Sequence, residues 1–111
     1  MTLTREIAQQ YQDHAIVSIE DYKIVAKGAF QGFDNLLAVQ FIGVESIEDD
    51  AFRDCTSLEQ VNLCDEITKI GSNAFTNTPI RYAQVSENLK LNQLFANKEP
   101  SRYYLRLYWG D

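Results

Sequence analysis

Residues 47–63 read Ile-Glu-Asp-Asp-Ala-Phe-Arg-Asp-Cys-Thr-Ser-Leu-Glu-Gln-Val-Asn-Leu, and parts of this stretch recur on both sides of it. Ala-Phe pairs stand at residues 29–30, 51–52 and 74–75, so the phenylalanines are 22 and then 23 residues apart (30 to 52, 52 to 75). A fixed period of this length is typical of a chain that winds into stacked coils. We therefore expect the three phenylalanines to lie in one column through the molecule.

Other apolar residues recur at the same period. The alternation Val39-Gln40-Phe41 indicates a strand with one buried face. Connections of about twenty residues would make successive strands parallel, and a period of about 20 to 29 residues predicts a leucine-rich-repeat solenoid. The expected ladders are Tyr22, Val44 and Ile67; Val25, Ile47 and Ile70; Leu36, Leu58 and Ile80; Val17, Val39, Val61 and Ala83; and Ile19, Phe41, Leu63 and Val85.

The two ends depart from the repeat. Residues 2–13 predict an amphipathic helix, capped by Thr2 or Thr4, with its apolar face on the first coil. We expect a single domain over residues 1–111, with an N-terminal cap helix at 1–14, repeats at 15–89 and a C-terminal cap at 90–111. On the return path, residues 49–50 and 72–73 are expected to cap short helices. The apolar face predicted for the N-terminal helix consists of Leu3, Ile7, Ala8 and Tyr11.

Two segments, Ala-Phe-Arg-Asp-Cys-Thr-Ser-Leu at 51–58 and Ile-Gly-Ser-Asn-Ala-Phe at 70–75, carry a resemblance. The chain resembles the BspA-like leucine-rich repeat, Ile-Gly-x-x-Ala-Phe-x-x-Cys-x-x-Leu-x-x-Ile-x-Leu, over about residues 15–89. The resemblance implies an α/β fold: a right-handed solenoid with a short parallel sheet on one face, an N-terminal helical cap and an aromatic C-terminal cap. Family members are typically surface proteins that bind host or matrix proteins, so it also implies protein binding.

Charge is distributed unevenly. The chain has 10 Lys and Arg against 16 Asp and Glu, a net charge of −6, and the acidic excess lies in residues 1–58. This balance disfavours direct binding to nucleic acid or to an anionic membrane and favours a partner with a basic surface. No apolar run approaches the length of a membrane span, and no secretory signal is visible. We expect a cytoplasmic protein, or a surface or secreted one if a signal has been removed.

Catalytic chemistry is not indicated. The only histidine, His14, has no predicted nucleophile beside it, because Cys55 is expected to be buried. Cys55 and Cys64 fit neither a disulfide scaffold nor a zinc site, and the five glycines lack the spacing of a phosphate-binding loop. The sequence predicts a non-enzymatic protein without a cofactor or a metal.

Three surfaces are candidates for binding a protein. Side chains between the buried strand positions should form one outward face, although amides there could also simply bond to one another in a solvated face. The acidic patch could steer a basic partner or form a solvated edge, and the aromatic tail could close the last coil or pair two copies. The face consists of Ser18, Gln40, Asn62, Tyr82 and Gln84; the patch of Glu45, Glu48, Asp49, Asp50 and Asp54; and the tail of Tyr104, Arg106, Tyr108 and Trp109.

These surfaces lead to three hypotheses. The first is a protein-interaction module that presents a rigid leucine-rich-repeat face. The second is an acidic inhibitor that occupies the basic, nucleic-acid-binding surface of another protein. The third is an oligomerising structural subunit, a homodimer joined through its tail.

Overall fold

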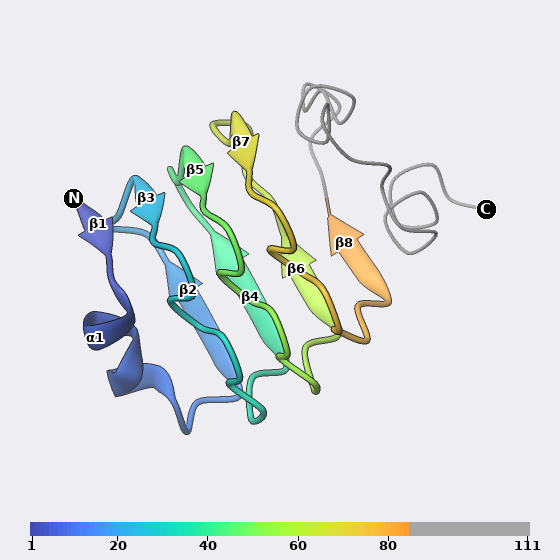
Figure 1. The fold of residues 1–111 in the computed structure, drawn as a ribbon. Helices are drawn as coiled ribbons and strands as arrows, with labels where there is room; N and C mark the ends of the chain where they lie inside the picture. The colour runs from blue at the N-terminus through green and yellow to red at the C-terminus, as the bar shows by residue number, and fades with distance from the viewer. Residues whose placement is uncertain (85–111) are drawn as a thin grey trace.

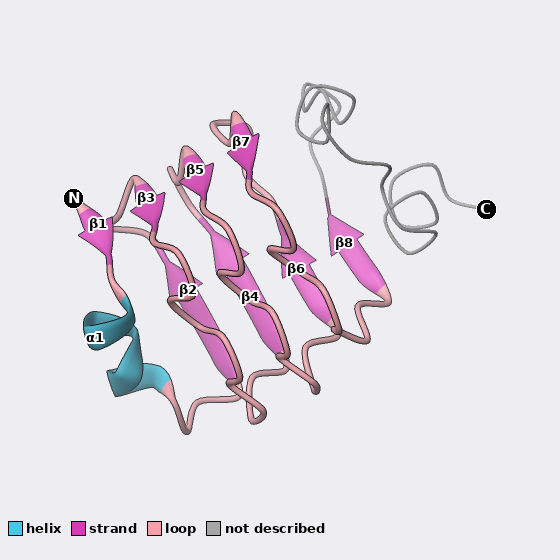
Figure 2. Ribbon diagram, in the orientation of Figure 1, coloured by secondary structure: helices cyan, strands magenta, loops and turns pink. Residues whose placement is uncertain are grey.

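A computed structural model describes residues 1–84 of the chain. These residues form a β-solenoid of about four turns, with parallel sheets and little helix (Figure 2). The coils follow one another from the N-terminus along the long axis, so each coil contacts only its neighbours (Figure 1). Such an arrangement lets each coil bury its apolar side against the next.

The longer strands form what we call the major sheet: β2 (Ile16–Ile19), β4 (Ala38–Phe41), β6 (Gln60–Asn62) and β8 (Tyr82–Gln84). The sheet order is the chain order, and all pairs are parallel. Val17, Val39 and Val61 stand in register and are buried. This confirms the predicted parallel sheet and its inward ladder.

A second, minor sheet lies on the opposite side of each coil and was not predicted. It consists of β1 (Thr2–Leu3), β3 (Ile24–Val25), β5 (Ser46–Ile47) and β7 (Lys69–Ile70), again all parallel. Two residues per strand are too few for alternation to be visible in the sequence. The expected ladder of Val25, Ile47 and Ile70 is its buried row.

The three Ala-Phe phenylalanines form a column between the sheets, as predicted. The rings of Phe30 and Phe52 stack at 4.8 Å between centroids and 10° between planes, and those of Phe52 and Phe75 at 5.4 Å and 6°. Phe41, from the major sheet, meets Phe52 edge-on at 5.6 Å. Offset stacks and edge contacts are the favoured geometries of aromatic rings, so the column is well packed.

The N-terminal segment differs from the predicted helix over 2–13. Only Arg5–Ala8 form an α-helix, α1, followed by a 3₁₀ turn at Gln9–Tyr11. Leu3 was expected on the helix but lies in β1, where its carbonyl accepts a hydrogen bond from Ala26 N–H at 2.9 Å. Pairing β1 with β3 satisfies backbone groups that a helix would have left open. Thr4 caps the helix, accepting from Ile7 N–H at 3.2 Å.

The return turns also differ from the prediction. No helix follows Asp49-Asp50 or Ser72-Asn73; Asp50 and Asn73 themselves adopt left-handed angles, each with φ near 59°. Gly28 holds the equivalent position in the first coil, with φ 62°. Turn amides bond to the next coil rather than within a helix: Phe30 N–H donates to Ala51 C=O and Phe52 N–H to Ala74 C=O, both at 2.7 Å. These bonds between coils compete successfully with helix formation.

Candidate functional site

The outward face of the major sheet contains no Asp, Glu, Lys, Arg or His in its strands. Ser18, Gln40 and Asn62 are exposed and stand in register across β2, β4 and β6, with Gln84 next in the backbone register. The structure therefore brings Ser18, Gln40 and Asn62 together, one side chain from each of three successive coils. Because the row lies on paired strands, its geometry is fixed by the backbone ladder.

The side chains of Ser18, Gln40 and Asn62 are not hydrogen-bonded to one another. Within the part of the chain that the structure describes, Ser18, Gln40 and Asn62 make no side-chain hydrogen bond. For these three residues, the predicted alternative in which the amides bond to one another is not seen; the side chain of Gln84 lies outside what the structure describes. Each amide keeps both donors and acceptors available to a binding partner.

Exposed apolar residues flank the row. Tyr82 at 64% exposure belongs to the predicted face, and Ile42 at 42% and Ile16 at 75% extend it at the two ends of the strands. Leu37, 44% exposed, was missed. It precedes β4 at the position that Glu59 and Arg81 hold in later coils, so aligning the coils would have revealed a leucine at a solvent position.

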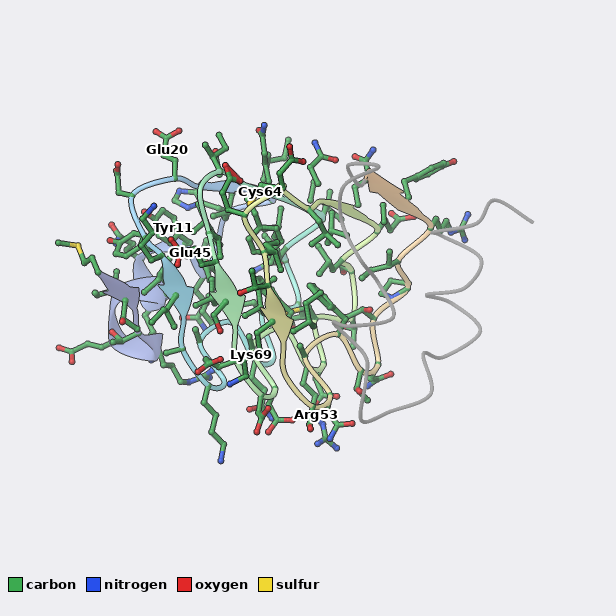
Figure 3. The ribbon with its side chains drawn as sticks, turned by 90° about the horizontal axis from the view of Figure 1, so that it is seen from above. Tyr11, Glu20, Glu45, Arg53, Cys64 and Lys69 are labelled. Atoms are coloured by element: carbon green, nitrogen blue, oxygen red, sulfur yellow. The ribbon has the colours of Figure 1, made fainter. Side chains whose placement is uncertain are left out.

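Cys64 follows β6 at the carboxyl end of the major sheet and lies on the side opposite Arg53 (Figure 3). It is half-buried, its thiol donates to Val44 C=O at 3.2 Å, and burial raises its pKa. Cys55 is fully buried, as predicted, and burial raises its pKa to about 12. Its thiol donates to Phe30 C=O at 3.1 Å, so it helps to hold two coils together. Both cysteines are free thiols.

Each carboxylate of the predicted acidic patch is engaged by a different partner. A hydrogen bond from Ser46 and the charge of Lys69, 3.0 Å away, lower the pKa of Glu48 against the opposing effect of burial. The patch is therefore a set of separate contacts between and within coils. The other pairs are Glu45 with Lys23 at 3.6 Å, Asp50 with Arg53 at 3.4 Å, Asp49 with Ser72 N–H at 2.7 Å, and Asp54 with Asn77 Nδ2 at 2.9 Å.

A shallow cavity of about 400 Å³ lies on the outer side of the minor sheet. It mixes two lysines with two carboxylates, and one of each already forms the Glu48–Lys69 pair. The described residues contain no group of three His, Cys, Asp or Glu that could hold a metal ion. The cavity is lined by Thr2, Ile24, Ala26, Lys27, Glu48, Asp49 and Lys69.

The predicted tail site, Tyr104, Arg106, Tyr108 and Trp109, lies outside the described residues. Within residues 1–84, no helix has the length and apolar character needed to cross a bilayer.

Comparison with known proteins agrees with this geometry. A family model described as the BspA type leucine rich repeat region matches residues 15–99. No curated protein and no solved structure gives a significant match. Modules of this kind generally mediate protein binding and are usually non-catalytic. The repeats, the stacked phenylalanines and the matched length together show that the chain belongs to the BspA-type leucine-rich-repeat family.

Proposed function

We propose that this protein is a non-catalytic interaction module whose contact surface is the outward face of the major sheet. The observation that carries the proposal is the absence of charged residues from the strands of that sheet, in a chain that is 23% charged. The centres of protein interfaces are depleted in charge and enriched in aromatic residues. Tyr82 and the amides of Gln40 and Asn62, which have no hydrogen-bond partner among the described residues, fit such a centre.

The salt bridges of the described residues support the same assignment, because none involves an outward residue of the major-sheet strands. They join Lys23 to Glu45, Asp50 to Arg53, Glu48 to Lys69 and Glu59 to Arg81. Only the last pair borders the face, just before β6 and β8. A binding surface usually carries its charged residues at the edge and few of them at the centre.

The acidic inhibitor is the weaker candidate. A basic partner would have to displace Lys69 from Glu48 and Arg53 from Asp50 to reach those carboxylates. Asp49 and Asp54 are already hydrogen-bonded to the following coil. The structural-subunit hypothesis stays a prediction, because the tail on which it rests lies outside residues 1–84.

We also propose that the N-terminal segment caps the solenoid. The Tyr11 ring lies 6.5 Å from the Phe30 ring, and Arg5 donates to Gly28 C=O at 2.6 Å and to Gln31 C=O at 3.0 Å. Ala8 is fully buried. These contacts cover the first coil, whose apolar side would otherwise meet water. A right-handed winding is proposed on general grounds, since parallel strands are connected that way in about 98% of cases.

The experiment is partner capture from the native source with the full chain and with a Gln40→Arg/Asn62→Arg double variant. Two buried charges without partners would oppose association, so the variant should lose the captured protein. Asn35→Arg is the control, because Asn35 is exposed in a turn outside the strands of the major sheet. The complex should persist from low to high salt, since the face carries no charge.

Retention of the same partner by the double variant would refute the assignment of this face. If the complex dissociates in high salt and the double variant still captures the partner, the acidic patch is favoured as the binding surface. Thermal unfolding of all variants must be alike for the comparison to hold.

A further inference from the structure

The size of the major-sheet face limits what it can bind. Four parallel strands about 4.8 Å apart span about 14 Å, and each contributes about 13 Å along its length. In flat projection this is on the order of 200 Å², far below the roughly 800 Å² per partner of a standard interface between folded proteins. A folded domain docked on this face alone would bury too little surface.

We infer, on the basis of the proposed function, that the occupant is a short, uncharged and extended polypeptide segment that crosses the strands along the row Ser18, Gln40 and Asn62. The span of about 14 Å corresponds to four or five extended residues at about 3.3 Å each. Contact area and length thus both fit a linear segment.

The chemistry of the row fits a peptide backbone. Every non-proline residue of an extended segment carries one N–H donor and one C=O acceptor, and both lose water on binding. Gln40 and Asn62 each offer an amide with donors and an acceptor, and Ser18 offers a hydroxyl. All three are exposed and unbonded within the described part of the chain. They can therefore pair with the backbone of the segment without first breaking an internal bond.

The flanking residues fit its side chains. In an extended chain successive side chains point to opposite sides. On one side of the row they would meet Ile16, Ala38, Gln60 and Tyr82, which stand in register. On the other side they would meet Ile42, with Glu20 and Cys64 at the equivalent positions of the neighbouring coils. An oligosaccharide of similar length would instead place hydroxyl groups against the apolar side chains among these, at a cost in desolvation. The geometry therefore favours a segment with apolar side chains and no charge.

The test is selection of a displayed library of random seven-residue peptides on the immobilised full chain. Enriched peptides are then synthesised and titrated into the isotope-labelled full chain. We expect a run of at least four residues without Asp, Glu, Lys or Arg. The side-chain amide signals of Gln40 and Asn62 should shift. Asn62→Arg should weaken binding at least tenfold, and the control Asn35→Arg less than twofold.

Three results would overturn the inference: no enrichment, unchanged binding by Asn62→Arg, or enriched peptides that are mainly charged. A peptide of residues 101–111 is a further probe. Selection could return sequences like residues 103–109, and this probe alone could shift the Gln40 and Asn62 signals. In that case the occupant is the chain's own tail, and the inference that a segment of a partner binds there is refuted. If no peptide binds but the Gln40→Arg/Asn62→Arg variant loses its native partner, the proposed function stands and this inference falls.

Discussion

The two sheets of the solenoid belong to the same coils but differ in what they present to solvent. The strands of the minor sheet carry Lys69, which bonds Glu48, and Ser46, which donates to the same carboxylate. The strands of the major sheet present amides, a hydroxyl, isoleucine and tyrosine, none of which is bonded within the described residues. On the minor sheet Lys69 joins two coils through Glu48 and Ser46 orients that carboxylate, whereas Ser18, Gln40 and Asn62 on the major sheet make no side-chain hydrogen bond within the described residues.

The difference shows how a repeat protein can separate stability from binding. A buried row must be apolar in every coil, because each coil packs on the next. An outward row has no such constraint, so its composition reflects other requirements. The two outward rows can therefore be compared directly, with the shared core as the reference.

The largest expected effect comes from removing the core that both sheets share. Phe52 is fully buried, stacked between Phe30 and Phe75 and touched edge-on by Phe41. Phe52→Ala should lower the free energy of unfolding by about 3–5 kcal/mol. Urea unfolding followed by circular dichroism measures the loss. A loss below about 1 kcal/mol would mean that the column is not central to stability.

An intermediate effect is expected on the minor side alone. A Cβ added at Gly71 would run into the backbone and the carboxylate of Asp49, which accepts from Ser72 N–H. Gly71→Ala should cost about 1–3 kcal/mol by overpacking. Gly43, after β4 of the major sheet, has φ 71° and open space around it, so Gly43→Asn should cost little, because asparagine tolerates this angle. Equal losses in urea unfolding of the two variants would contradict this contrast.

The smallest effect concerns the ion pair of the minor sheet. The hydrogen bond from Ser46 and the charge of Lys69 lower the pKa of Glu48 below the ordinary value of a glutamate, against the opposing effect of burial. The stability it contributes is therefore present above that value and is lost as the pH falls through the lower, folded-state pKa. The amount should stay below about 1 kcal/mol, because Lys69 is largely exposed.

Unfolding free energies of the wild type and Glu48→Gln between pH 6 and pH 3 measure this contribution. The difference between the two curves should shrink towards the acid end. Glu20→Gln is the control, since it removes an exposed carboxylate without a partner in the described residues. A difference that grows on acidification would contradict the assigned direction.

Sequence reasoning found the features that repeat over long distances. The Ala-Phe column, the inward ladders and the outward row follow from a period of 22 or 23 residues, because the same position in each coil meets the same environment. It missed features decided by two or three residues. The minor-sheet strands are too short to show alternation, and β1 was assigned to a helix because Leu3 fitted the helical spacing as well as it fits a strand.

The candidate site was predicted only as a set of positions. Spacing does not reveal that Gln40 and Asn62 make no side-chain hydrogen bond within residues 1–84. Nor does it reveal that Glu48 and Asp50 are paired with basic residues, because both facts depend on side-chain contacts. Asp50 and Asn73 were interpreted as helix caps, but aspartate and asparagine favour left-handed turns as well as caps, so the residue types alone did not distinguish the two. Distinguishing the two required knowing that the turn amides bond to the next coil.

The central claim is that the two sheets have different roles, and a matched pair of substitutions tests it directly. Ile16 and Ile24 are each the first residue of a strand and point outward, one on the major sheet and one on the minor. The measurement is the dissociation constant of the captured partner for Ile16→Arg and Ile24→Arg. We predict at least a tenfold loss, about 1.4 kcal/mol, for Ile16→Arg and less than twofold for Ile24→Arg. The reverse order would contradict the account.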